Sequence, residues 1–199
     1  TVLNFMGSRE YESSIMANET VEATVVFIDI CSFTSISEKE SPDTVVRLLN
    51  DYFDVIVKEV IAQGGYIDKF IGDAIMAVFR GKFHLDRAID ACLAVRTKID
   101  SLPTLNDKVN FTPKVSMGIN SGEMISGNIG SATLRRLDYT VIGDVVNTAQ
   151  RLQSTATPGQ IIINEASYQK VKESFNCRKV GEAILKNKTN PVVTYEVMD

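Results

Sequence analysis

The stretch from Tyr66 to Phe79 constrains the fold more than any other part of this sequence. It predicts two strands that meet at a tight turn formed by Gly72 and Asp73. The second strand, 74–79, is almost wholly apolar, as expected for a strand that is covered on both faces. This hairpin is therefore expected to be buried in a sheet, where any charge needs a use or a partner.

The hairpin carries two charges, Lys69 and Asp73. Taken alone, they fit a lysine that extends to solvent and an aspartate in a solvated turn. A second apolar run, 23–30, changes this interpretation because it carries Asp29 near its end. If both runs are strands of one sheet, the two carboxylates lie at the same edge, where they repel each other unless a cation binds between them. Carboxylate oxygens suit Mg²⁺, so the pattern predicts a two-metal site for phosphoryl transfer.

The order of the expected elements indicates the fold class. Strands are expected at 22–30, 66–71, 74–79 and 115–120, and helices at 42–63 and 84–101. This β-α-β-β-α-β order is typical of an α+β, ferredoxin-like core, with an antiparallel sheet and both helices on one face.

The remaining residues are expected to extend this core with C-terminal β-α-β elements. A turn is expected at Ser121–Gly122 and a flexible connection at 127–130. Further elements are expected in this order: a strand at 135–142, a helix at 145–155, a strand at 160–163, a helix at 165–173 capped by Asn164, and a hairpin-like tail at 178–197.

Length and composition bound the function. The 199 residues suit one domain, expected at 21–199 after a polar arm at 1–20. A net charge of −4 argues against a nucleic-acid-binding surface, and no apolar run is long enough for membrane insertion. Cys31, Cys92 and Cys177 form no metal motif, which indicates reduced thiols and a cytoplasmic setting. The single histidine, His84, supports neither a zinc site nor a catalytic triad and is expected at the surface.

A second informative stretch runs from Tyr139 to Arg151. Asn147 and Arg151 are four residues apart on an expected helix and therefore share one face. Such a pair can position a sugar and neutralise charge in a phosphoryl transition state. An exposed, hydrogen-bonded pair without a function is the alternative interpretation.

Three stretches taken together, 27–34, 69–73 and 139–151, resemble the catalytic domain of class III nucleotidyl cyclases. The similarity covers about 21–197 and is greatest to the bicarbonate-responsive adenylyl cyclases of cyanobacteria. It implies an adenylyl cyclase that converts ATP to 3′,5′-cyclic AMP and pyrophosphate. It also implies a head-to-tail homodimer in which each active site uses residues from both chains.

The resemblance assigns a role to each candidate site residue. Asp29, Asp73 and the Ile30 carbonyl would hold two Mg²⁺ ions, for which Mn²⁺ can substitute. Lys69 and Thr140 of the other chain would recognise adenine. Asn147 would position the ribose, and Arg151 would stabilise negative charge on the α-phosphate. Lys188 and the backbone amides around Phe33 and Thr34 would bind the β- and γ-phosphates.

Base choice has a physical logic within this resemblance. Lys69 can donate a hydrogen bond to adenine N1, which is an acceptor. Guanine N1 carries a hydrogen, so two donors would face each other there. Thr140 can accept from the exocyclic amine or hold another acceptor toward it. The threonine form goes with bicarbonate-responsive members of the family.

Two alternatives stay open at this point. One is a palm-like nucleotidyltransferase or diguanylate cyclase, against which the missing Gly-Gly-Asp/Glu-Glu-Phe hairpin counts. The other is a catalytically silent dimerisation or sensing module. The complete set of polar site residues argues against this second alternative.

Overall fold

The computed structural model describes residues 18–102, 114–131, 136–184 and 191–199. In these ranges the chain forms one sheet in the order β2-β3-β1-β4-β6-β8-β7, with β5 paired to β4. The elements are β1 (Glu19–Ile30), α3 (Phe33–Ser37), α4 (Pro42–Ala62), β2 (Tyr66–Ile71), β3 (Ala74–Arg80), α5 (His84–Ser101), β4 (Val115–Ser131), β5 (Arg136–Ile142), α6 (Asp144–Thr155), β6 (Ile161–Asn164), α7 (Glu165–Val171), β7 (Cys177–Ala183) and β8 (Val192–Val197).

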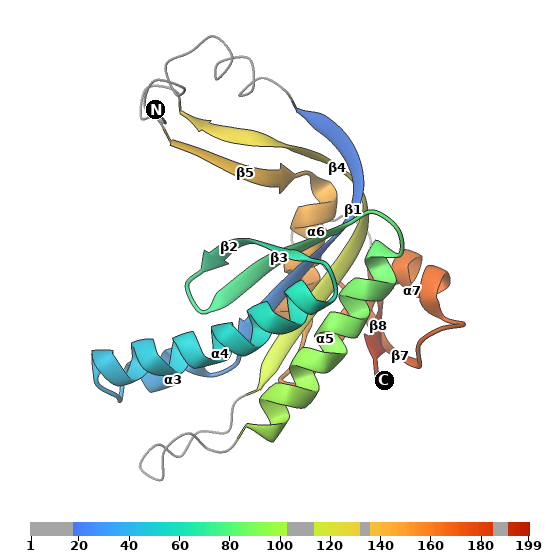
Figure 1. The fold of residues 1–199 in the computed structure, drawn as a ribbon. Coiled ribbons are helices and arrows are strands. Elements are labelled where there is room, and N and C mark those ends of the chain that lie inside the picture. The colour runs from blue at the N-terminus through green and yellow to red at the C-terminus, as the bar shows by residue number, and fades with distance from the viewer. Residues whose placement is uncertain (1–17, 103–113, 132–135, 185–190) are drawn as a thin grey trace.

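The first six main elements form the expected ferredoxin-like core. β1 pairs antiparallel with both β3 and β4, and β2 pairs antiparallel with β3. α4 and α5 lie side by side on one face of this sheet (Figure 1). The α+β fold class and the β-α-β-β-α-β order are therefore confirmed.

Both faces of the central strands are buried because a second layer covers the other face. Alternate residues of β1 enter different clusters: Val26 and Ile28 pack with α4 and α5, whereas Val25 and Phe27 pack with α6. β3 is buried in the same way, as predicted. β2 departs from the prediction of a buried hairpin, because it lies at the sheet edge and leaves Phe70 53% exposed.

The ends of α4 follow from local sequence signals. The Ser41 hydroxyl accepts a hydrogen bond from the Thr44 amide at 3.4 Å, and Pro42 occupies the first turn. The helix stops before Gly64, whose φ of +71° is costly for any residue with a Cβ. The expected helix, its cap and its termination are thereby confirmed.

The expectations for β1 and β4 need correction. β1 begins at Glu19, so Glu19 and Thr20 belong to the strand and not to the arm. β4 continues to Ser131, so neither a turn at Ser121–Gly122 nor a flexible connection at 127–130 exists. Gly118 in the same strand permits a close approach, since a Cβ there would lie 2.4 Å from the Ala149 carbonyl oxygen of α6. Small residues in β4 therefore allow tight packing and do not indicate a loop.

The C-terminal elements extend the sheet beyond β4. β6 runs parallel to β4, β8 pairs antiparallel with β6, and β7 forms the edge. Asn164 caps α7 by accepting from the Ser167 amide at 2.9 Å, as predicted. The helix ends at Val171, two residues earlier than expected.

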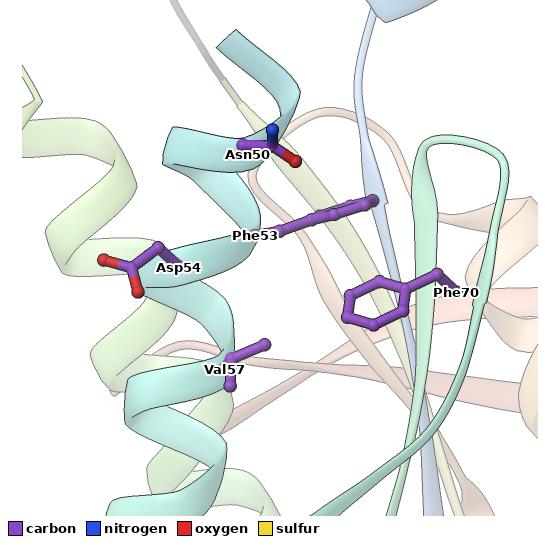
Figure 2. Close-up of a pocket in the computed structure, with 5 residues that line it drawn as sticks. All are labelled: Asn50, Phe53, Asp54, Val57 and Phe70. Carbon is purple, nitrogen blue, oxygen red and sulfur yellow. The ribbon is translucent and has the colours of Figure 1, made fainter. Parts of the chain in front are cut away.

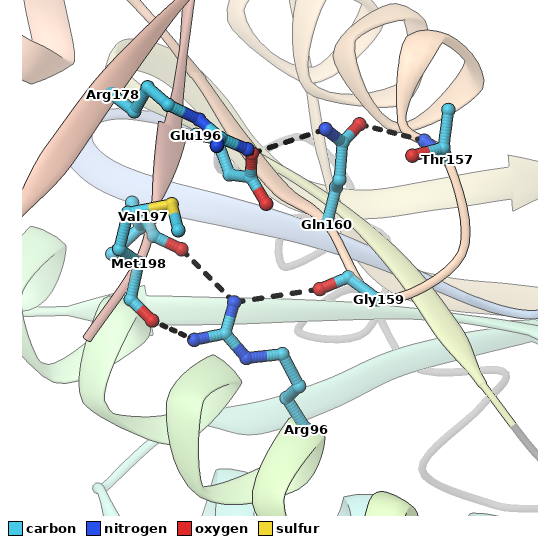
Figure 3. Close-up of polar contacts among 8 residues, drawn as sticks. All are labelled: Arg96, Thr157, Gly159, Gln160, Arg178, Glu196, Val197 and Met198. Atoms are coloured by element: carbon cyan, nitrogen blue, oxygen red, sulfur yellow. Dashed lines mark hydrogen bonds and ion pairs between the residues drawn. The ribbon is translucent and has the colours of Figure 1, made fainter.

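A single arginine ties this extension to the core (Figure 3). Arg96 on α5 donates to the carbonyl oxygens of Val197, at 3.1 Å, and of Met198. It also donates to the Gly159 carbonyl in the turn before β6. Because the three carbonyls come from two separate segments, one guanidinium fixes the end of β8 and the start of β6 against α5.

His84 is only half exposed, which corrects the expected surface position. Its Nδ1 forms a 2.7 Å hydrogen bond with the Thr24 hydroxyl on β1. Burial is the largest influence on the ring and lowers the pKa of His84. The residue thus joins the start of α5 to the sheet.

The three cysteines are free thiols, as predicted, and Cys92 is buried. Among the residues that the structure describes, no helix has the length and apolar character that a membrane crossing requires.

Candidate active site

Asp29 and Asp73 lie together at one end of the β1–β3 pair. Asp29 is opposite Ala74 in the register, and the Ile30 amide donates to the Asp73 carbonyl at 3.3 Å. Gly72, with a φ of +62°, allows the turn that places Asp73 directly before β3. The predicted convergence of the two carboxylates is therefore present in the structure.

The electrostatics of this pair favour a bound cation. The pKa of Asp29 is raised to about 6, first by burial and then by the negative charge of Asp73. The described residues contain no cluster of three or more histidine, cysteine, aspartate or glutamate side chains suited to a metal. Two carboxylates and a carbonyl match the sparse protein ligand set of Mg²⁺ when substrate phosphates complete the coordination.

The raised pKa of Asp29, caused first by burial and then by the charge of Asp73, makes a prediction about stability. Since folding raises the pKa of Asp29, its contribution to stability is lost as the pH rises from about 4 to about 6. Asp29→Asn should therefore raise the melting temperature of the metal-free protein at pH 7. Allowing for solvent screening, we expect about 1 kcal/mol, or about 2–4 °C.

Calorimetric melts in a chelator at pH 7 and pH 4 measure this effect. The gain should shrink at pH 4, where the Asp29 carboxyl of the folded original protein is largely protonated and uncharged. Asp51→Asn, on the exposed face of α4, is the matched control and should change the melting temperature little at either pH. A lower melting temperature for Asp29→Asn at pH 7 would contradict this argument.

Lys69 and Thr140 form direct contacts although 71 residues separate them in sequence. Lys69 Nζ donates to Thr140 Oγ1 at 3.1 Å. Thr140 Oγ1 in turn donates to Asp68 Oδ1 at 2.9 Å, and Lys69 Nζ lies 3.2 Å from the same oxygen. The structure thus brings together the two predicted base-recognition residues and adds a third, Asp68, which the sequence analysis did not select.

A β-bulge explains how adjacent residues of β2 reach the same partner. The register advances from Ile67 opposite Ala77 to Lys69 opposite Met76, so Asp68 is the extra residue. Successive side chains of a regular strand point to opposite faces, and a bulge redirects one of them. Two charged neighbours in an apolar strand are the sequence signal that could have identified Asp68.

Asn147 and Arg151 lie on α6, whose backbone approaches β4 closely at Gly118. A Cβ at Gly118 would lie 2.4 Å from the Ala149 carbonyl oxygen, so glycine allows this contact. Val146, Ala149 and Leu152 are buried, as the helical spacing predicts. Asn147 is exposed and Arg151 half buried, and within the described parts of the chain neither side chain has a hydrogen-bond partner.

The remaining candidates lie beside the aspartates or outside the described ranges. Phe33 and Thr34 begin α3, which follows β1 directly, and the first amides of a helix have no acceptor within it. Phe33 is buried and Thr34 exposed. Lys188 lies outside the described residues.

A separate pocket of about 420 Å³ lies between α4 and β2 (Figure 2). Five residues line it: Asn50, Phe53, Asp54, Val57 and Phe70. The rings of Phe53 and Phe70 lie with their centroids 4.8 Å apart. None of the candidate site residues is among these five. Phe70 follows Lys69 on β2, but its ring contacts Phe53 on α4.

Known proteins are similar to this chain in sequence. The sequence profile described as the adenylate and guanylate cyclase catalytic domain matches residues 15–199. An adenylate cyclase of Anabaena cylindrica is 35% identical over 91% of this chain, and a terminal-differentiation-specific adenylate cyclase of Dictyostelium discoideum is 34% identical over 88%. The chain spans only 38% and 8% of their respective lengths.

Solved structures agree with these sequence matches. The adenylyl cyclase CyaB from P. aeruginosa superposes with a TM-score of 0.86 at 33% identity, covering 92% of this chain and 96% of that one. The guanylate cyclase domain of RhGC from Catenaria anguillulae, solved with GTP, superposes with a TM-score of 0.81 at 28% identity, covering 90% and 98%. Fold and sequence thus agree, and the chain belongs to the adenylate and guanylate cyclase catalytic domain family.

Proposed function

We propose that this domain is an adenylyl cyclase that converts ATP to 3′,5′-cyclic AMP and pyrophosphate. The ribose 3′-oxygen forms a bond to the α-phosphorus, and the bond from that phosphorus to the bridging oxygen of pyrophosphate breaks. The 3′-hydroxyl proton is released, and pyrophosphate leaves with the electron pair of the broken bond.

Asp29, Asp73 and the Ile30 carbonyl hold two Mg²⁺ ions in this proposal, or Mn²⁺ in their place. The fit rests on the donor chemistry, since two mutually repelling carboxylates at one strand end favour a divalent cation. Bound Mg²⁺ lowers the pKa of the 3′-hydroxyl and neutralises charge on the phosphates.

The other residues bind and orient ATP. Lys69 donates to adenine N1, and Thr140 accepts from the exocyclic amine. Asn147 holds the ribose, and Arg151 stabilises negative charge on the α-phosphate. The amides of Phe33 and Thr34, together with Lys188, bind the β- and γ-phosphates.

The active form in this proposal is a head-to-tail homodimer. Each site takes the two aspartates from one chain and the lysine, threonine, asparagine and arginine from its partner. The lack of side-chain partners for Asn147 and Arg151 within the described residues supports a role toward a ligand. Free thiols support a reducing, cytoplasmic setting.

The observation that carries the proposal is the 3.1 Å contact between Lys69 and Thr140. A lysine cannot accept a hydrogen bond and therefore suits N1 of adenine better than the N1–H of guanine. Purified protein should form cyclic AMP from ATP with Mg²⁺ or Mn²⁺. Its kcat/KM for GTP should be at least about 100-fold lower, which corresponds to about 2.7 kcal/mol of discrimination.

Product chromatography with each nucleotide and metal tests the proposal. Bicarbonate should raise the rate of cyclic AMP formation, because the threonine at position 140 goes with bicarbonate-responsive relatives. Cyclic GMP as the main product would reassign the substrate. Absence of both products, together with no binding of Mg²⁺-ATP by calorimetry, would indicate a catalytically silent module.

A further inference from the structure

We propose that Asp68 is the residue that sets base specificity, by taking the Thr140 proton and holding Lys69 beside it. The pair then offers the base one donor and one acceptor in a fixed order. This inference rests on the proposed function, because it concerns the same base-recognition residues. Asp68 acts through Lys69 and Thr140 and is a positioning residue, not a catalytic one.

The contacts form a closed triangle around a buried carboxylate. Asp68 Oδ1 receives the Thr140 hydroxyl at 2.9 Å and lies 3.2 Å from Lys69 Nζ. Lys69 Nζ donates to Thr140 Oγ1 at 3.1 Å. The Asp68 side chain is fully buried, whereas the Lys69 side chain is 42% exposed. Thr140 is 5% exposed, so the lysine and, over this small area, the threonine are the members of the triangle that can meet a base.

Donor and acceptor inventories fix the direction of each bond. An ionised carboxylate only accepts, an ammonium only donates, and a hydroxyl has one proton and two lone pairs. Thr140 must therefore donate its proton to Asp68, and one of its lone pairs accepts from Lys69. What remains for a ligand is the second lone pair of Thr140 and an N–H of Lys69.

This arrangement matches adenine and opposes a 6-oxopurine. Adenine presents an acceptor at N1 and a donor at its 6-amino group, opposite Lys69 and Thr140 respectively. Hypoxanthine and guanine present a donor at N1 and an acceptor at O6. Thr140 could donate to O6 only by leaving Asp68, which would leave a buried carboxylate with one hydrogen-bond donor fewer.

Stability alone does not account for Asp68. A buried charge is costly, and an apolar residue of similar volume is often neutral or stabilising in its place. Asp68 Oδ2 is buried and has no hydrogen-bond partner among the described residues. The β-bulge that directs Asp68 toward Thr140 is a further departure from regular strand pairing. A costly group that contacts both base-recognition residues is best explained by specificity.

The test compares turnover of ATP with that of inosine triphosphate, which differs from ATP only at the 6-position and N1. Asp68→Leu frees the Thr140 proton to donate to O6. We expect the ratio of kcat/KM for ATP to that for inosine triphosphate to fall by about 10- to 100-fold. Asp68→Asn retains an oxygen that accepts from Thr140, so its ratio should stay within about threefold of the original.

A double-mutant cycle separates this role from general damage. In a Thr140→Val background, Asp68→Leu should lower the ratio by clearly less than it does alone, because the hydroxyl whose proton Asp68 takes is gone and only the contact of Asp68 with Lys69 remains. Ser126→Ala is the matched control, since this buried serine donates its hydrogen bond to the Tyr139 hydroxyl, at 2.8 Å, and not to a base-recognition residue. Its ratio should not change.

The outcomes distinguish the two proposals. If the unmodified protein cyclises neither ATP nor GTP, the proposed function fails. If it forms cyclic AMP but folded Asp68→Leu keeps the original ratio, only the role of Asp68 fails. If Asp68→Asn lowers the ratio as much as Asp68→Leu does, the proposal that Asp68 acts by accepting the Thr140 proton is also wrong. If Asp68→Leu does not fold, the other two variants test the role of Asp68. The role is sustained if Asp68→Asn keeps the ratio of ATP to inosine triphosphate turnover within about threefold of the original and Thr140→Val lowers it.

Discussion

Asp73→Ala is expected to lower the rate of cyclic AMP formation by at least about 10³-fold, and Asp29→Ala should do the same. The two carboxylates form the protein's side-chain ligand set for the proposed metals, and metal charge contributes several kcal/mol to stabilising a phosphoryl transition state. Neither change opens a core cavity, because both residues lie at the end of the sheet and are partly exposed. Activity should therefore fall without loss of the fold.

Initial rates at saturating Mg²⁺-ATP measure this effect, with circular dichroism and size-exclusion chromatography as checks on folding and assembly. Asp51→Ala, on the exposed side of α4, serves as the control and should retain the original rate. If a folded, dimeric Asp73→Ala protein keeps more than about a tenth of the activity, the metal assignment is wrong.

Mixing two inactive variants, Asp73→Ala and Arg151→Ala, is expected to restore about a quarter of the original activity. In a symmetric homodimer with shared sites, random reassociation makes about half of the dimers heterodimers. Each heterodimer then contains one site with both substitutions and one site with neither. Rates measured after co-refolding or subunit exchange give the restored fraction.

The matched control mixes Asp29→Ala with Asp73→Ala. Both substitutions affect the half-site proposed to come from one chain, so every site in that mixture lacks a metal ligand and no activity should return. If heterodimers of Asp73→Ala and Arg151→Ala form but remain inactive, the sites are not shared between chains. The homodimer mechanism would then have to be abandoned.

Local sequence patterns were sufficient for most of the core. Apolar runs, the Ser41–Pro42 helix start and the Gly72–Asp73 turn depend on interactions within a few residues, so α4, the β2–β3 hairpin and α5 were predicted closely. β4 was misjudged because glycine and serine are common in turns. In this chain the segment stays extended because it pairs with β1 and β5, and the pairing with β1 joins distant parts of the sequence.

The site residues also divide into those that local sequence patterns indicated and one that depends on distant contacts. The end of an apolar run indicated Asp29, the turn after Gly72 indicated Asp73, and helical spacing indicated Asn147 and Arg151. Asp68 was missed because a regular strand would direct it away from Lys69. The bulge in β2 reverses that direction, and it depends on the pairing with β3.

The amino-acid sequence by itself determined the elements, their order and the chemistry available at the end of the sheet, because periodicity, capping and turn formation are local. Only the tertiary structure decided that Thr140, on the strand β5 that pairs with β4, reaches both Lys69 and Asp68 on β2. The physical reason is that sheet curvature, the bulge and the close packing of α6 on Gly118 are set by contacts between residues far apart in the chain.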